Sequence, residues 1–181
     1  MRQSKKEIKD GEVIMDLLKT CHVGRLGTIG SDGYPVVKPL NFVWDEGVIY
    51  FHTALAGEKM EDIKRDSRVC FEIDLPIAYV KGDKSPCRAE YLFRSVIIKG
   101  RAGLVDNADE KLKALRCLMN KYQPESAYAD FPQDKLAITG VVKIVIEEMA
   151  GKEDLGNDSL REAALKALRD GVPLPIVLER T

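Results

Sequence analysis

Two short turns in the first third of the chain constrain its fold most strongly. Ser31-Asp32-Gly33 and Asp45-Glu46-Gly47 each interrupt an apolar, strand-like stretch. Glycine supplies the positive φ of a tight hairpin turn at little cost, so both segments are typical of hairpin connections. The sequence therefore predicts an antiparallel meander of three strands, over about residues 21–29, 34–44 and 48–53, which is how an all-β barrel or sandwich begins.

Periodicity adds helices and further strands to this meander. Apolar positions at the helical period predict helices over about residues 6–20, 57–66 and 108–122. Apolar runs predict strands over about residues 69–73, 89–105 and 138–149.

The segments outside these elements differ in character. Residues 76–86 are rich in turn-forming types, and we expect a mobile excursion there. Beyond residue 153 the chain becomes polar with a thin leucine stripe, which predicts a helix within 155–169 and an extended tail. We therefore expect one domain over residues 1–152 and a C-terminal appendage over residues 153–181.

Composition excludes several classes of protein. The 28 Lys and Arg residues are balanced by 29 Asp and Glu residues, so the chain lacks the basic footprint of a nucleic-acid binder. No apolar run is long enough to span a membrane, and residues 1–7 lack the apolar core of a signal peptide. We therefore expect a cytoplasmic protein.

The four cysteines do not form a metal or redox motif. Cys21, Cys70, Cys87 and Cys117 are irregularly spaced, and no CxxC pair occurs. We expect reduced and mostly buried thiols, with Cys70 and Cys117 in the core, and no metal site.

A candidate phosphate site follows the third predicted strand. The strand ends at His52 and Thr53, crosses a small-residue turn to Gly57, and opens a helix that carries Lys59. The first backbone N–H groups of a helix are unsatisfied donors at the positive end of the helix dipole, so they attract anions. A hydroxyl and an ammonium beside them suit a phosphate. Lys59 as an ordinary solvated helix residue is the alternative.

The order of elements, together with several motifs, resembles the FMN-binding split barrels related to pyridoxamine 5′-phosphate oxidase. Within them the chain is most similar to the nitroimidazole-resistance (Nim) group. The motifs are Val23–Leu26, Gly33–Phe42, Ile49–Thr53 with Gly57 and Lys59, Val69–Glu72, Tyr91 with Ser95–Val96, and Gly100–Ala102. The resemblance covers about residues 1–152.

The resemblance implies a mainly β fold with flanking helices, an antiparallel, Greek-key-like split barrel. It implies a homodimer with two FMN sites at the subunit interface and Ser95 supplied by the partner chain. The second strand would lie along the isoalloxazine edge, and the turn after the third strand would take the phosphate. The implied cofactor-binding residues are Val37, Lys38, Pro39, Leu40 and Asn41 for the ring, and His52, Thr53, Gly57 and Lys59 for the phosphate.

Two departures from the resemblance bear on function. Pyridoxamine phosphate oxidases carry a basic residue just before the lysine of the phosphate turn, where this chain has Glu58. The phosphate would then rely on Lys59, Thr53 and backbone donors, with Arg25, Lys38 or Lys152 as further candidates. The C-terminal Trp and Arg substrate signature of those oxidases is missing as well, which disfavours vitamin B6 oxidation.

Some of these residues have equally ordinary interpretations. Arg25 and Lys38 can face solvent or an acid, Asn41 can be a plain ladder residue, and Lys152 can be a surface lysine. His52 is the candidate catalytic residue, because an imidazole beside a flavin can donate a hydrogen bond or a proton near neutral pH. Its alternative is a strand-end cap. His22 is expected to be structural, with an axial haem ligand at His22 or His52 left open.

The sequence thus supports an FMN-dependent oxidoreductase that reduces a small electrophile such as a nitroaromatic or a quinone. The flavin would carry the redox chemistry. Two alternatives remain: a non-catalytic FMN- or haem-binding protein, and a barrel whose site is degenerate because of Glu58. No GxGxxG motif identifies a nicotinamide site.

Overall fold

The computed structural model describes residues 4–179, and the first three residues of the N-terminal segment considered above lie outside them. The helices of this part are η1 (Ser4–Lys6), α1 (Gly11–Thr20), α2 (Glu58–Arg65), η2 (Pro86–Arg88), α3 (Ala108–Tyr122), α4 (Gln133–Ile138) and α5 (Asp158–Asp170). The strands are β1 (Glu7–Ile8), β2 (Gly24–Ile29), β3 (Pro35–Leu40), β4 (Val43–Asp45), β5 (Val48–Ala54), β6 (Arg68–Val80), β7 (Glu90–Leu104), β8 (Thr139–Asp154) and β9 (Ile176–Leu178).

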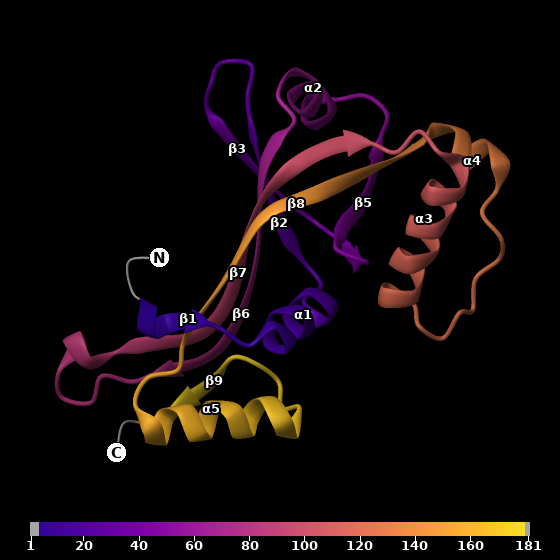
Figure 1. The fold of residues 1–181 in the computed structure, drawn as a ribbon. Helices are drawn as coiled ribbons and strands as arrows, with labels where there is room; N and C mark the ends of the chain where they lie inside the picture. The colour runs from indigo at the N-terminus through magenta and orange to yellow at the C-terminus, as the bar shows by residue number, and fades with distance from the viewer. Residues whose placement is uncertain (1–3, 180–181) are drawn as a thin grey trace. The chain divides into compact units, whose positions relative to one another are not determined.

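The strands form one sheet in the order β3-β2-β6-β7-β8-β5-β4, with β1 paired to β8 and β9 paired to β6 (Figure 1). The two predicted hairpins, β2 with β3 and β4 with β5, are present and antiparallel, but they do not form the predicted three-strand meander, because β6, β7 and β8 lie between them in the sheet. The pairing of β6 with β9 is parallel. This confirms a mainly antiparallel β fold with flanking helices.

By their contacts, the residues group into two compact units. The smaller unit contains the chain up to Leu17, Asp74–Val96, and the chain from Ala150 onward. The larger unit contains Leu18–Ile73 and Ile97–Met149. The long strands β6, β7 and β8 each contribute residues to both units.

The smaller unit has a core made by the C-terminal segment and the end of β6. Leu160 and Ala164 of α5 pack with Ile77 and Val80 of β6. Asn157 caps α5, because its side chain accepts a hydrogen bond from the Leu160 N–H at 3.1 Å. The polar stretch with a thin leucine stripe therefore forms a helix, as predicted, and docks by that stripe.

The larger unit places different side chains on the two faces of β5. Successive side chains of a strand alternate between faces. Tyr50 turns toward α3, where its hydroxyl donates to Glu110 at 3.1 Å, and it belongs to a core cluster with Leu115 and Leu118. Phe51, on the opposite face, is fully buried. Helix α3 spans the predicted residues, and the Asn107 side chain caps it by accepting from the Glu110 N–H.

One predicted strand is interrupted. The strand expected over residues 34–44 ends at Leu40 and resumes at Val43. At the break, the Phe42 N–H donates to the Tyr122 hydroxyl at 2.9 Å, and the oxygen of that hydroxyl lies 3.0 Å from the Phe42 carbonyl. Phe42 therefore takes its hydrogen bonds from α3 rather than from a neighbouring strand, which frees the chain to turn between β3 and β4.

The expectation of a mobile excursion over residues 76–86 is wrong for its first half. Strand β6 continues to Val80, because Ile77, Ala78 and Val80 are fully buried and β9 pairs with residues 78–80. Burial of these apolar side chains and pairing with β9 keep the chain extended past Pro76, although the composition of the segment is typical of turns.

The expectation of mostly buried thiols is also wrong. Cys21 is buried and Cys117 is partly buried, whereas Cys70 and Cys87 are exposed. Cys70 lies between buried Val69 and Phe71 on β6, so alternation points its thiol to the outer face. Within residues 4–179, no helix is long and apolar enough to cross a membrane.

Candidate functional site

The turn between β5 and α2 presents unsatisfied backbone donors. Gly57 precedes the helix at a φ of 120°, a conformation that favours glycine, and no side chain caps the helix. The Gly57 carbonyl accepts the first helical bonds, from Met60 at 2.9 Å and from Glu61 at 3.1 Å. The N–H groups of Glu58 and Lys59 precede those bonds, so they lie at the positive end of the helix.

Two lysines add charge at this turn. The Lys59 ammonium lies 5.1 Å from the centre of the Phe51 ring, and burial together with the nearby charge of Lys38 lowers the pKa of Lys59. Lys38, on β3, forms a salt bridge with Glu58. Within the described residues no carboxylate forms a salt bridge with Lys59. An incoming anion would relieve the repulsion between the two ammonium groups, so this lysine pair is an electrostatic match for a phosphate.

The other predicted residues of β2 and β3 divide between the faces of the sheet. Lys38 lies opposite Leu26, whose side chain is buried, whereas Arg25 lies opposite Pro39 and Glu72. Arg25 donates to the Glu72 carboxylate at 3.1 Å. Arg25 and Lys38 therefore occupy opposite faces, and the structure does not bring Arg25 to the lysine pair. Along β3, Val37 shares the face of Pro39, and Leu40 that of Lys38.

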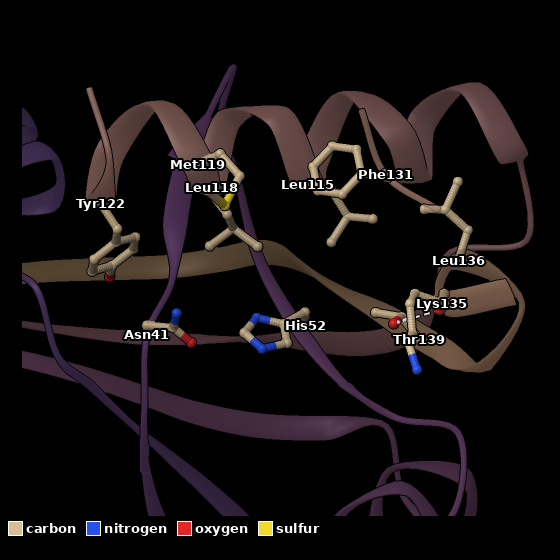
Figure 2. Close-up of a pocket in the computed structure, with 10 residues that line it drawn as sticks. All are labelled: Asn41, His52, Leu115, Leu118, Met119, Tyr122, Phe131, Lys135, Leu136 and Thr139. Carbon is tan, nitrogen blue, oxygen red and sulfur yellow. Dashed lines mark hydrogen bonds between the residues drawn. The ribbon is translucent and has the colours of Figure 1, made fainter. Parts of the chain in front are cut away.

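His52 is separated from Lys59 by the strand that carries it. Thr53 shares the face of Phe51, whose ring lies beneath Lys59, and His52 shares the face of Tyr50, toward α3. There His52 and Asn41 line a cavity of about 230 Å³ (Figure 2). The single cluster expected from the turn thus becomes two: a lysine pair on one side of β5, and His52 with Asn41 on the other.

The cavity has an apolar wall and a polar floor. Figure 2 shows Leu115, Leu118 and Met119 of α3 directed toward His52 and Asn41. The lining is completed by Tyr122, Phe131, Lys135, Leu136 and Thr139. Sequence reasoning missed this cavity, because apolar residues at the helical period of α3 do not distinguish a core from a cavity wall and α4 carries too few residues for a periodic signal.

A larger concavity lies on the outer face of the sheet. It has a volume of about 550 Å³ and is lined by residues of β2, β3, β6, β7 and β8 that include Gly27, Val37, Cys70 and Lys99. Apolar side chains are exposed on the same strands of the larger unit: Ile29, Val37, Ile97, Val145 and Met149.

Ser95 and Lys152 belong to the smaller unit. Ser95 is partly buried on β7, and the Lys152 ammonium lies 5.3 Å from the centre of the Phe93 ring. Their proposed roles stay predictions. Among the described residues, no three His, Cys, Asp or Glu side chains gather in an arrangement that could hold a metal ion.

Comparison with solved structures confirms the predicted split-barrel fold. The flavocytochrome Anf3 from Azotobacter vinelandii is 21% identical, with a TM-score of 0.76 over 90% of this chain and 77% of that one. A candidate 5-nitroimidazole antibiotic resistance protein from Bacteroides thetaiotaomicron is 23% identical, with a TM-score of 0.72 over 81% and 86%. An FAD- and haem-binding protein from Mycobacterium smegmatis is 18% identical, with a TM-score of 0.72 over 87% and 80%.

The sequence itself matches a family. The sequence model of pyridoxamine 5′-phosphate oxidase matches residues 10–153, which is most of the chain. No functionally curated protein has a significant match.

Proposed function

The chain belongs to the pyridoxamine 5′-phosphate oxidase family, and we propose that it is an FMN-binding oxidoreductase whose phosphate site is the Lys38–Lys59 pair. The observation that carries the proposal is the half-buried Lys59, which has no salt bridge among the described residues, beside the donors that open α2. The fold neighbours supply circumstantial support, because they include proteins described as a flavocytochrome, an FAD- and haem-binding protein and an F420 reductase.

The donor set suits a flavin phosphate. Lys59 and the N–H groups of Glu58 and Lys59 can hold two phosphate oxygens, and the Thr53 hydroxyl lies on the same face of β5. Glu58 opposes binding, since its carboxylate neutralises Lys38. When bound, the flavin supplies the redox chemistry, while the protein contributes binding and orientation.

His52 is proposed as the proton or hydrogen-bond donor toward the substrate. Its imidazole is exposed and lines the cavity beneath α3. The strand that carries His52 pairs with β8 at seven positions, which fixes the backbone from which the imidazole reaches the cavity. The proposed substrate is a small electrophile such as a nitroaromatic or a quinone.

We further propose a homodimer. The exposed Ile97, Val145 and Met149 on β7 and β8 lie on strands that also line the larger concavity. Exposed apolar side chains grouped on one sheet are typical of a protein interface. A second copy of the chain would cover them and would contribute Ser95 to the flavin site.

A non-catalytic flavin- or haem-binding role is the second candidate. It is favoured by two fold neighbours described as a flavocytochrome and as an FAD- and haem-binding protein. His52 and His22 are both exposed and are the available axial ligands.

An absorption spectrum and a flavin titration test the proposal. Bands near ~370 and ~450 nm indicate bound flavin, whereas a Soret band indicates haem. Lys59→Ala should weaken FMN binding by about tenfold or more, since a charge-assisted contact is lost. Lys64→Ala, an exposed lysine on the same helix, is the matched control.

Riboflavin, which lacks the phosphate, makes the test specific. Its affinity should not change in Lys59→Ala. An equal loss of affinity for riboflavin and FMN would show that Lys59 supports the structure of the protein rather than binding the phosphate. FAD titrated in parallel shows which flavin the protein prefers.

A further inference from the structure

The cavity beneath α3 has the properties of a ligand site in its own right, and we propose that it binds a small aromatic carboxylate. The site is independent of the flavin phosphate, because its floor is formed by the face of β5 opposite Lys59. His52 is also the donor proposed above for the substrate, but the binding of an aromatic carboxylate here does not require the flavin, so this proposal stands whether or not the protein binds FMN.

The size of the cavity fits one ring with a short substituent. An apolar cavity of about 150 Å³ is enough to hold benzene. This cavity is about 230 Å³, which leaves room for a carboxylate besides the ring. Leu115, Leu118 and Met119 form one wall and Phe131 extends it, so a flat apolar ring is covered on the α3 side (Figure 2).

Two polar groups of the floor have no partner within the described part of the chain. No hydrogen bond forms there from the His52 imidazole or the Asn41 amide, and in Figure 2 the two side chains lie next to each other facing the α3 wall. Other polar groups of the lining are already satisfied: the Thr139 hydroxyl donates to the Lys135 carbonyl at 2.8 Å, and the Tyr122 hydroxyl donates to the His22 carbonyl at 2.6 Å. His52 and Asn41 are the donors left for a ligand.

Charge selects the class of ligand. Lys135 lines the cavity, and its one salt bridge there, to Asp134, spans 3.8 Å between two largely exposed side chains, so it holds the ammonium only weakly. No Asp or Glu is among the lining residues. A carboxylate therefore gains the Lys135 charge and the His52 and Asn41 donors without meeting a like charge.

The proposal is tested with benzoate and its neutral analogue benzamide. The chain has two histidines, so the His52 ring signals can be assigned in an NMR spectrum by comparison with His52→Ala. Benzoate should shift the His52 signals and leave those of His22 unchanged, with a dissociation constant of about 1 mM or lower. Benzamide should bind about fivefold more weakly.

Four variants locate the site. Met119→Trp fills the cavity and should abolish binding, with circular dichroism as the check on folding. Lys135→Gln should reduce the preference for benzoate over benzamide to about one, and Lys64→Gln should leave it unchanged. Lys59→Ala should bind benzoate as the wild type does, which separates this site from the flavin phosphate site.

Several outcomes would overturn the proposal. If benzamide binds as tightly as benzoate, the cavity does not select a carboxylate. Benzoate that shifts His22 instead of His52, or that binds the folded Met119→Trp variant unchanged, would move the ligand out of the cavity. If benzoate does not bind the wild-type protein, the proposed site does not exist, whether or not the Met119→Trp variant folds.

Discussion

Replacing Tyr122 by Phe removes one hydroxyl that holds three segments of the larger unit together. Tyr122 is the last residue of α3, and its hydroxyl accepts from the Phe42 N–H at 2.9 Å. Its proton is within reach of the His22 carbonyl at 2.6 Å and the Phe42 carbonyl at 3.0 Å. Burial raises the pKa of Tyr122, so the hydroxyl remains a donor at neutral pH.

The expected cost follows from the partners left behind. The substitution keeps the ring and leaves the Phe42 N–H, and one carbonyl, without the hydroxyl. Phe42 is fully buried, so water cannot easily replace the lost partner. An unsatisfied buried polar group costs about 1–3 kcal/mol, and we expect the free energy of unfolding to fall by about 2 kcal/mol. For a chain of this length the melting temperature would fall by about 4–8 °C.

The chain provides its own probe for this measurement. Trp44 is the only tryptophan and lies on β4, two residues after Phe42, so its fluorescence follows urea unfolding of the affected region. Tyr128→Phe is the control, because the Tyr128 hydroxyl makes one long, exposed bond of 3.5 Å. A loss below about 0.5 kcal/mol in Tyr122→Phe, no larger than in the control, would refute the structural role of the hydroxyl.

Three further outcomes are expected. Gly24→Ala should lower the free energy of unfolding by about 2 kcal/mol or more, since its Cβ would lie 2.0 Å from the buried Phe71 ring; urea unfolding measures it. Burial lowers the pKa of Lys121 to about 8, so the unfolded chain binds more protons above that pH. Stability should therefore rise by about 1 kcal/mol between about pH 8 and 10, and melting curves of Lys121→Met should lack the rise. Glu58→Gln should release Lys38 and tighten FMN binding about two- to fivefold in a titration; unchanged or weaker binding would count against the lysine pair.

The sequence predicts helix α3 to the residue because two independent signals agree there. The apolar positions recur at the helical period, and acidic residues follow Asn107 at the start of the helix. The break between β3 and β4 has no such signal. It depends on the Tyr122 hydroxyl, a contact between residues 80 positions apart in the chain, which no local pattern contains.

The candidate site shows the same division. The position of Lys59 at the start of α2 follows from the turn and is readable in the sequence. The separation of His52 from Lys59 depends on which face of β5 packs against α3. Tyr50 and Phe51 are both large and apolar, so the sequence alone does not show which of them faces α3. Once Tyr50 is known to pack against α3, the direction of His52 on the same face follows.

The placement of two candidate sites on opposite faces of one strand has a practical meaning for redesign. Substitutions at His52 or Tyr50 change the α3 side, and substitutions at Thr53 change the other, so the two sites can be mutated as separate libraries. An insertion or deletion of a single residue within β5 would exchange the two sets of side chains and disrupt both sites at once. In strand β5, substitutions at His52 and Thr53 can therefore be combined across faces, while a change of length would disrupt both sites.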